Sequence, residues 1–408
     1  MKKFFLCFLL FVLLLTACNK KVNNNIGEQT SNATSDEFVA LVGANELCQG
    51  SKILGTTDNF AEGLDGTYCY DNTKSCIYYI QNGSNEKIPL CGKPECEHTA
   101  KFNVAIETCN AYFENGITGS LKYYNNKLYI LSHDELTYEV TLYQIELDGS
   151  EKKEISVIDT CASANDFSDA YVYVMDEKYL YVISTNSTDF KSEMCRIDIK
   201  TGLKDTLFTG GFMQFGKLKL YNNNLFYQNW TKVDGKNQYL ICRYDLEEQK
   251  EYILVKGENI ISYNINGLKN ELLYWTESEG LYSYSLEKGT TNLVKVCNSQ
   301  YDKSCNIACT NKYIIVDNNF SRIGVNKKEF KRKIEILDFE YNVVSEIIIN
   351  DEDIKLCSAN YCSNKYIFID GSGCWYAVDI ENPQKNIEVT DEHFVKEPGL
   401  DEPPIVYN

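Results

Sequence analysis

The sequence predicts an all-β protein folded as a β-propeller, with seven blades favoured and six to eight compatible with the pattern. The first observation is a repeated motif in which a polar turn leads into a strand of alternating side chains. Its copies are NNKLYIL (125–131), DEKYLYV (176–182), NNNLFYQ (222–228), KNELLYW (269–275), TNKYIIV (310–316) and SNKYIFI (363–369). They recur at intervals of roughly 40 to 50 residues, the length of one four-stranded blade.

The second observation is composition. The 408-residue chain contains 30 Tyr and 19 Phe but only six Pro, which favours strands. A seventh, weaker repeat precedes the others, from Leu64 to Ile88. A single small sheet cannot bury both of its faces, whereas a closed ring of such sheets can. We therefore expect the propeller to occupy residues 59–392.

Each repeat also carries a second strand that ends in an acid, an apolar residue and a charged residue. The acids at this position are Glu146, Asp198, Asp245, Asp338 and Asp379, and Ser285 replaces the acid in one repeat. Gly or Asn tends to follow, as in a tight turn. Because an enzyme needs one set of catalytic carboxylates and not one in every repeat, we interpret these acids as turn-capping residues.

The N-terminus predicts export from the cytoplasm. Lys2 and Lys3 precede an apolar segment, Phe4 to Leu15, that is shorter than the roughly 20 residues of a membrane-spanning helix and typical of a signal peptide. We expect residues 1–17 to be removed from the mature protein.

Residues 15–18, Leu-Thr-Ala-Cys, resemble the lipobox of bacterial lipoproteins. The resemblance implies that Cys18 is lipidated, with diacylglyceryl and acyl chains such as palmitate, and becomes the mature N-terminus at the outer face of the cell membrane. Two or more such chains anchor a protein stably, whereas one is marginal. The alternative is an ordinary signal peptide in which Cys18 occurs by chance.

The segments outside the repeats are short. Residues 18–37 are polar and contain no aromatic side chain, so we expect a disordered tether after the lipidated cysteine. Residues 38–58 form a lead-in segment, and residues 393–408 form a C-terminal tail. Ring closure is expected to involve pairing of residues 391–408 with residues 38–54.

A cysteine- and histidine-rich insertion, residues 89–113, follows the first repeat. Its spacing is C-x4-C-x-H-x10-C, from Cys91, Cys96, His98 and Cys109. In an extended segment, residues two apart such as Cys96 and His98 point to the same side. Three thiolates and one imidazole form a ligand set that structural zinc prefers. The spacing is compatible with three interpretations: a structural zinc site, a disulfide within the cluster, or unlinked thiols.

The remaining cysteines, of 17 in total, are compatible with disulfides outside the cytoplasm. Cys195 and Cys242, however, occupy the same strand position in consecutive repeats, where a free cysteine packs as a small buried hydrophobe. A catalytic zinc site is disfavoured because four protein ligands leave no position for water.

The net charge and the absence of common catalytic motifs argue against several classes of function. The net charge of −18 would repel phosphate backbones, so we expect no nucleic-acid partner. The sequence contains no G-x-S-x-G, H-E-x-x-H, P-loop or G-x-G-x-x-G motif. His133 and His393 lie in polar segments and are not expected to be catalytic.

One repeat resembles a known propeller type. The segment LLYWTESEGLYSYSLEKG, Leu272 to Gly289, resembles a repeat of YWTD-type propellers, and the other repeats share only the looser outline of YWTD-like and TolB-like propellers. The order of lipobox, tether and propeller repeats with a cysteine cluster resembles β-propeller lipoproteins of low-GC Gram-positive bacteria. This resemblance covers most of the chain and implies no activity.

These observations predict an extracytoplasmic lipoprotein whose propeller is a non-catalytic binding module for a peptide, glycan or envelope protein. Trp230 is a candidate residue for contact with that partner, although it is equally compatible with packing between two blades. The alternative is an extracytoplasmic carbohydrate-active hydrolase or lyase that uses propeller carboxylates. A substrate-binding lipoprotein of an importer would have two α/β lobes, which conflicts with the repeats.

Overall fold

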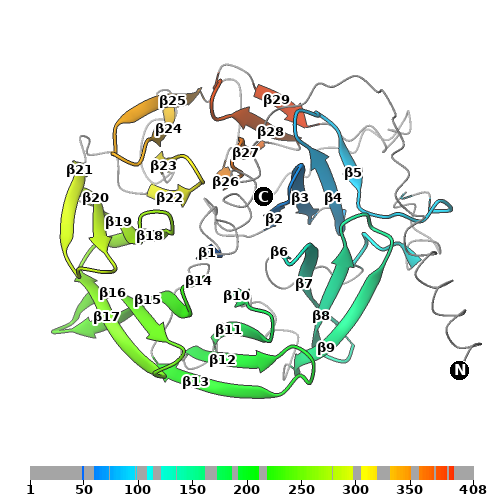
Figure 1. Ribbon diagram of the computed structural model, residues 1–408, viewed down its shortest axis with the longest axis horizontal. Coiled ribbons are helices and arrows are strands. Elements are labelled where there is room, and N and C mark those ends of the chain that lie inside the picture. The colour runs from blue at the N-terminus through cyan, green and yellow to red at the C-terminus, as the bar shows by residue number, and fades with distance from the viewer. Residues whose placement is uncertain are drawn as a thin grey trace, which may run out of the picture. The chain divides into compact units, whose positions relative to one another are not determined.

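The computed structural model describes residues 48–49, 59–72, 74–96, 98, 108–113, 121–134, 136–160, 172–185, 192–210, 218–277, 279–296, 305–318, 331–350, 358–371, 374–383 and 386–389. The chain divides into two units, Met1–Ala40 and Leu41–Asn408, and all of the described residues lie in the second. They confirm an all-β propeller of seven blades (Figure 1). No helix in this part of the chain is long and apolar enough to cross a membrane.

Each blade is an antiparallel sheet whose four strands are consecutive in the chain. The first three blades are β2–β5 (Phe60–Glu62, Gly66–Asp71, Cys76–Gln81, Lys87–Pro89), β6–β9 (Lys122–Tyr124, Lys127–His133, Glu139–Glu146, Lys152–Thr160) and β10–β13 (Val172–Met175, Tyr179–Thr185, Ser192–Asp198, Lys204–Gly210). The next two are β14–β17 (Lys219–Tyr221, Asn224–Val233, Lys236–Asp245, Lys250–Gly257) and β18–β21 (Ile260–Asn266, Glu271–Thr276, Gly280–Ser285, Thr291–Val296). The last two are β22–β25 (Cys305–Cys309, Ile314–Asn318, Lys331–Leu337, Val343–Asn350) and β26–β29 (Ser358–Cys362, Tyr366–Gly371, Cys374–Asp379, Asn386–Val389). The first strand of each blade lies innermost and the fourth lies at the rim (Figure 1).

One further strand, β1 (Cys48–Gln49), adds a fifth strand to blade 4 by pairing with β14. This pairing differs from the expectation that residues 38–54 pair with the C-terminal tail. The other residues of that expectation, including 391–408, lie outside the described residues. A free inner edge of blade 4 offers unpaired backbone groups, which explains why a short extended segment can bind there.

The polar turns of the repeated motif join the first and second strands of the blades. Asn125 and Asn126 have φ angles of 47° and 57°, and Asn222 and Asn223 have the same pair of values. Two consecutive left-handed residues form the tight turn that suits the twist of a β-hairpin, and Asn tolerates this conformation better than most residues. The Asn-Asn pairs therefore specify these hairpins.

The recurring acids cap the turns between the third and fourth strands, which confirms the sequence interpretation. Asp198 Oδ1 accepts hydrogen bonds from the backbone N–H groups of Lys200 (3.1 Å) and Thr201 (2.9 Å). Asp245 and Asp379 make the same pair of bonds, with the N–H groups two and three residues on. Asp338 Oδ1 accepts from the N–H groups of Glu340 and Asn342, and Ser285 Oγ accepts one from Lys288. Glu146 is the exception, because its carboxylate forms an ion pair with Lys127.

The two ends of the blades differ in their connections. At one end, an N–H group of the turn between strands three and four donates to a carbonyl of the turn between strands one and two. These bonds are Ile199 to Lys178, Leu246 to Asn223, Leu286 to Asn270 and Ile380 to Lys365. We call this end the capped face. The opposite end joins strands two and three and connects successive blades, and we call it the loop face.

Tyrosine hydroxyls link neighbouring blades. Tyr173 on β10 donates a hydrogen bond to the carbonyl of Tyr129 in blade 2 (3.0 Å), and Tyr263 on β18 donates to the carbonyl of Phe226 in blade 4 (2.9 Å). A buried tyrosine contributes apolar area but requires a partner for its hydroxyl. The innermost strands thus use tyrosine both to fill the space between blades and to join them.

The ring closes where blade 7 meets blade 1. The Phe60 ring on β2 packs against the rings of Tyr361, Phe368 and Trp375, with centroid distances of 5.7, 5.3 and 5.0 Å. The backbone N–H of Glu62 also donates to the hydroxyl of Tyr361 (3.1 Å). Among the described residues, no sheet is shared between the two blades. Within the described part of the chain, side-chain packing and hydrogen bonds join the two blades.

Candidate metal centre

The Cys/His insertion interrupts the outer strand of blade 1. Before it, the N–H of Leu90 donates to the carbonyl of Ile77 at 2.9 Å, and after it the N–H of Ile77 donates to the carbonyl of Ala111 at 2.9 Å. The strand position next to β4 is therefore occupied first by residues 87–90 and then by residues 111–113. Between these two pairings the chain runs through residues 91–110, and we call this segment the excursion.

The ends of the excursion pack on the neighbouring blade. The N–H of Gly92 and the side-chain amide of Asn110 both donate to the carbonyl of Gly149, at 2.9 and 2.8 Å. Gly149 lies in the turn between β8 and β9 with φ of 68°, and a Cβ there would lie 2.7 Å from the backbone of Leu90 and Cys91. The close approach of blades 1 and 2 at this point therefore requires glycine.

Lys152 on β9 strengthens the same junction. Its ammonium donates to the carbonyls of Cys109 (3.3 Å) and Tyr112 (2.7 Å) and lies 4.7 Å from the centre of the Phe113 ring. Burial lowers the pKa of this lysine from its ordinary value, and nearby thiols oppose that shift. One ammonium of blade 2 thus holds the returning end of the excursion.

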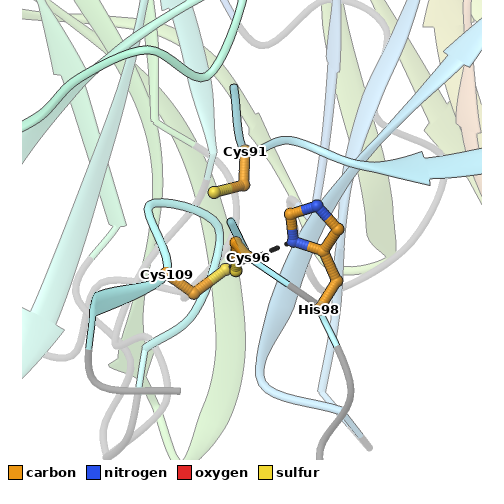
Figure 2. A group of neighbouring side chains, drawn as sticks. All are labelled: Cys91, Cys96, His98 and Cys109. Atoms are coloured by element: carbon orange, nitrogen blue, oxygen red, sulfur yellow. Dashed lines mark hydrogen bonds between the residues drawn. The ribbon is translucent and has the colours of Figure 1, made fainter. Parts of the chain in front are cut away.

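The excursion gathers the four predicted side chains. Cys91 and Cys109 stand at its two ends, and Cys96 and His98 come from its first half (Figure 2). Their ligand atoms all lie within 4.8 Å of one another, and the Cys109 Sγ to His98 Nδ1 distance is 3.9 Å. Tetrahedral zinc, with bonds of about 2.0–2.3 Å, separates its ligand atoms by roughly 3.3–3.8 Å. The arrangement could hold a metal ion with little movement of the side chains.

The local electrostatics suit thiolate ligands. Burial opposes ionisation of Cys91, but hydrogen bonds from the backbone N–H groups of Lys93 and Asn110 and from the neighbouring thiols together lower the pKa of this thiol. Burial raises the pKa of Cys109 to about 12. Positive charge is therefore needed to stabilise a second thiolate at Cys109, and a bound metal ion supplies such charge. The donor set and its surroundings fit a cation.

The sequence singled out these four side chains as candidate metal ligands, and the structure brings all of them together. Cys91, Cys96 and Cys109 form no disulfide in this arrangement. Sequence reasoning missed the supporting residues Asn110, Gly149 and Lys152. Gly149 occurs in LDGS, where its only sequence signal was that of a turn.

The other residues singled out in the sequence lie outside the Cys/His cluster. Cys195 and Cys242 are buried at irregular steps of their strand pairing, as expected for small apolar side chains. Their burial raises the pKa of both thiols, that of Cys195 to about 12. Trp230 is partly exposed on β15. Cys18 and His393 lie outside the described residues.

No family model and no curated protein matches the chain. Several solved structures are similar to it. The tricorn protease is similar over 83% of this chain and 35% of its own (11% identity, TM-score 0.53), so the chain spans about a third of that protein. An oligogalacturonate lyase in complex with manganese is similar over 64% of this chain and 73% of its own, with 12% identity and a TM-score of 0.44. TolB from Acinetobacter baumannii is similar over 81% of this chain and 78% of its own, with 10% identity and a TM-score of 0.40. At these identities the likeness shows the fold alone.

Proposed function

We propose that this protein is a lipid-anchored extracytoplasmic binding protein whose propeller presents its loop face to a peptide, glycan or envelope protein. The observation that carries the proposal is the difference between the two faces. The turns of the capped face are short and joined by hydrogen bonds. On the loop face, the ends of consecutive strands lie further apart in the sequence: β9 ends at Thr160 and β10 begins at Val172, and β23 ends at Asn318 and β24 begins at Lys331. Binding residues concentrate on loops that a rigid scaffold positions.

Site-specific photo-crosslinking tests which face binds. Lys232, near the tip of the β15–β16 hairpin, is exposed on the loop face, and Lys200 is exposed in a turn of the capped face. A photo-reactive residue at position 232 should capture an envelope component from intact cells, and the same residue at position 200 should not. Capture at position 200 alone, or no capture above that of an unrelated acidic lipoprotein, would contradict the proposal.

The anchor is the second part of the proposal and rests on the lipobox. An alkyne analogue of palmitate fed to the native host should label the protein, and Cys18→Ala should abolish both the label and the recovery of the chain in the membrane fraction. Unlabelled wild-type protein in the culture medium would instead indicate an ordinary signal peptide.

Zinc is the metal that we propose for the cluster, in a structural role. A Cys3His set is closed to substrate, and it would join the two ends of the excursion beside blade 2. Native mass spectrometry should show one zinc ion that is lost on acidification, because the ligands must release their protons to bind it. A mass that instead lacks two hydrogens per cysteine pair would establish a disulfide.

The alternative function, a carbohydrate-active hydrolase or lyase, requires two carboxylates that converge on one substrate. Four of the recurring acids, Asp198, Asp245, Asp338 and Asp379, are each engaged with the N–H groups of their own turn, in four different blades. Their distribution favours a structural role. We therefore place binding ahead of catalysis.

A further inference from the structure

A cleft opens between blades 4 and 5 at the loop face. Its volume is about 310 Å³, which lies within the range of small-ligand pockets. One side is the connection between β17 and β18, and the other is the end of the β19–β20 hairpin. The N–H of Glu277 donates to the carbonyl of Asn259 at 3.0 Å, so a backbone hydrogen bond joins the two sides.

Two stacked tyrosines form the apolar part of this cleft. Tyr274 and Tyr282 are direct partners across β19 and β20, with ring centroids 5.1 Å apart and ring planes 8° from parallel. Tyr274 is only 6% exposed, whereas Tyr282 is partly exposed. The hydroxyl of Tyr282 donates to the carboxylate of Glu279, which fixes both side chains. The pair therefore offers a preformed aromatic wall.

Polar groups of both kinds line the remainder of the cleft. Glu258 and Glu279 supply acceptors, Lys256 supplies donors, and the amide of Asn259 supplies both. Thr276 also lines the cleft, and within the described residues its buried hydroxyl has no hydrogen-bond partner. A buried polar atom without a partner carries a free-energy cost that a bound ligand can relieve.

We infer that this cleft is a binding site for a neutral saccharide. A sugar ring presents C–H groups with partial positive charge, which suit the negative face of an aromatic ring. Its hydroxyls both donate and accept, as the mixed lining requires. The lining carries two carboxylates, those of Glu258 and Glu279, and one ammonium, that of Lys256, whereas the ammonium of Lys236 lies outside the lining in an exposed pair with Glu258 at 4.0 Å. This excess of negative charge in the lining disfavours phosphates and uronic acids. The inference deepens the proposed binding function, on which it rests, by naming the glycan class and its subsite.

Saturation-transfer NMR on the full lipidated chain, in a detergent without a sugar headgroup, tests this site. The probes are cellobiose and N,N′-diacetylchitobiose, with digalacturonate and lysine amide as charged comparisons. A neutral disaccharide should bind, and Tyr282→Ala should weaken it by about tenfold, equivalent to about 1.4 kcal/mol. Digalacturonate should bind more weakly than the neutral probes.

Tyr252→Ala is the matched control. Tyr252 also donates its hydroxyl to a nearby glutamate, Glu248, but lies on β17 toward the capped face. This variant should bind the disaccharide as the wild type does. Thr276→Val is a second test, because it keeps the shape of the side chain. It should weaken binding while leaving the melting temperature unchanged or raised.

Three outcomes would overturn the inference: no transfer to either neutral disaccharide, equal weakening by Tyr282→Ala and Tyr252→Ala, or displacement of the sugar by lysine amide. The crosslinking at position 232 separates this failure from failure of the broader proposal. If that position still captures an envelope component in the Tyr282→Ala variant while neutral sugars do not bind, the loop face binds something else.

Discussion

Blade 1 is joined to its two neighbours in different ways. At its junction with blade 7, the Phe60 ring packs among three aromatic rings, and Lys87, paired with Asp71 at 2.7 Å, lies 4.8 Å from the centre of the Trp375 ring. At its junction with blade 2, the excursion brings a Cys3His set beside backbone contacts to Gly149. The first junction depends on aromatic burial, and the second on a local chain segment with metal-ligating side chains.

The contrast between the junctions shows why only one of them was visible in the sequence. The four candidate ligands lie within one short segment, so their spacing can be read directly from the sequence. The closing contacts join residues about 300 positions apart, such as Glu62 and Tyr361, and no spacing pattern predicts such pairs. Four changes to the protein test this contrast, and the losses of stability expected from them decrease in turn.

Phe60→Ala should have the largest effect, a loss of about 3–5 kcal/mol in the free energy of unfolding, because it empties a buried aromatic site. Phe113→Ala is the matched variant at the other junction. Phe113 is equally buried, at 4% exposure, but among the described residues it packs edge-on against the ring of Tyr143 rather than among three rings. Urea unfolding followed by tryptophan fluorescence should therefore show a smaller loss for Phe113→Ala. An equal or larger loss would remove the distinction between the junctions.

Lys87→Met should cost about 3 kcal/mol, at the lower end of the range for breaking a buried ion pair. Both side chains of the pair are 10% exposed, so some charge remains solvated. The double variant Asp71→Asn, Lys87→Met should recover part of the loss, because no unpaired carboxylate remains at the site. Additive losses in a double-mutant cycle would show that the ion pair itself does not stabilise the ring.

Metal removal should cost about 2.7 kcal/mol relative to protein in zinc at 100 times its dissociation constant. Thermal unfolding with and without a chelator measures this difference. Cys96→Ser should abolish the response to chelator, whereas Cys195→Ser, at a buried thiol outside the cluster, should retain it. The response should also disappear as the pH falls, because protons displace the metal from thiolates and imidazole. A chelator response that persists in Cys96→Ser would place the metal elsewhere.

The smallest expected effect is the difference between two glycine variants. Gly149→Ala should lower the free energy of unfolding by about 1 kcal/mol more than Gly235→Ala does. Both glycines have left-handed backbones, with φ of 68° and 80°, so both substitutions introduce similar backbone strain. Only at Gly149 would the new Cβ meet backbone of the next blade, whereas Gly235 has open space around it. The difference between the two variants in urea unfolding isolates the contact. Equal losses would mean that the two blades can separate there without cost.

Much of the fold could be predicted from local chemistry. The Asn222-Asn223 pair specifies a hairpin, and Asp245 caps the turn between β16 and β17 of the same blade, because each acts on backbone groups within a few residues. The same local logic located Cys91, Cys96, His98 and Cys109. The Tyr274–Tyr282 cleft was not foreseen. In the sequence, its YWTE segment indicates only a propeller repeat. The opposite side of the cleft comes from the preceding blade, so no local pattern predicts it.

The amino-acid order was enough to establish the all-β character and the repeat length and to single out the four clustered side chains, because alternation, turn chemistry and residue spacing act over short chain distances. The packed structure alone established which rings close the propeller, which glycine lets blades 1 and 2 approach, and which side chains share a cleft. These contacts depend on the packing of whole sheets against one another. Such packing joins distant residues through burial and shape rather than through any order in the chain.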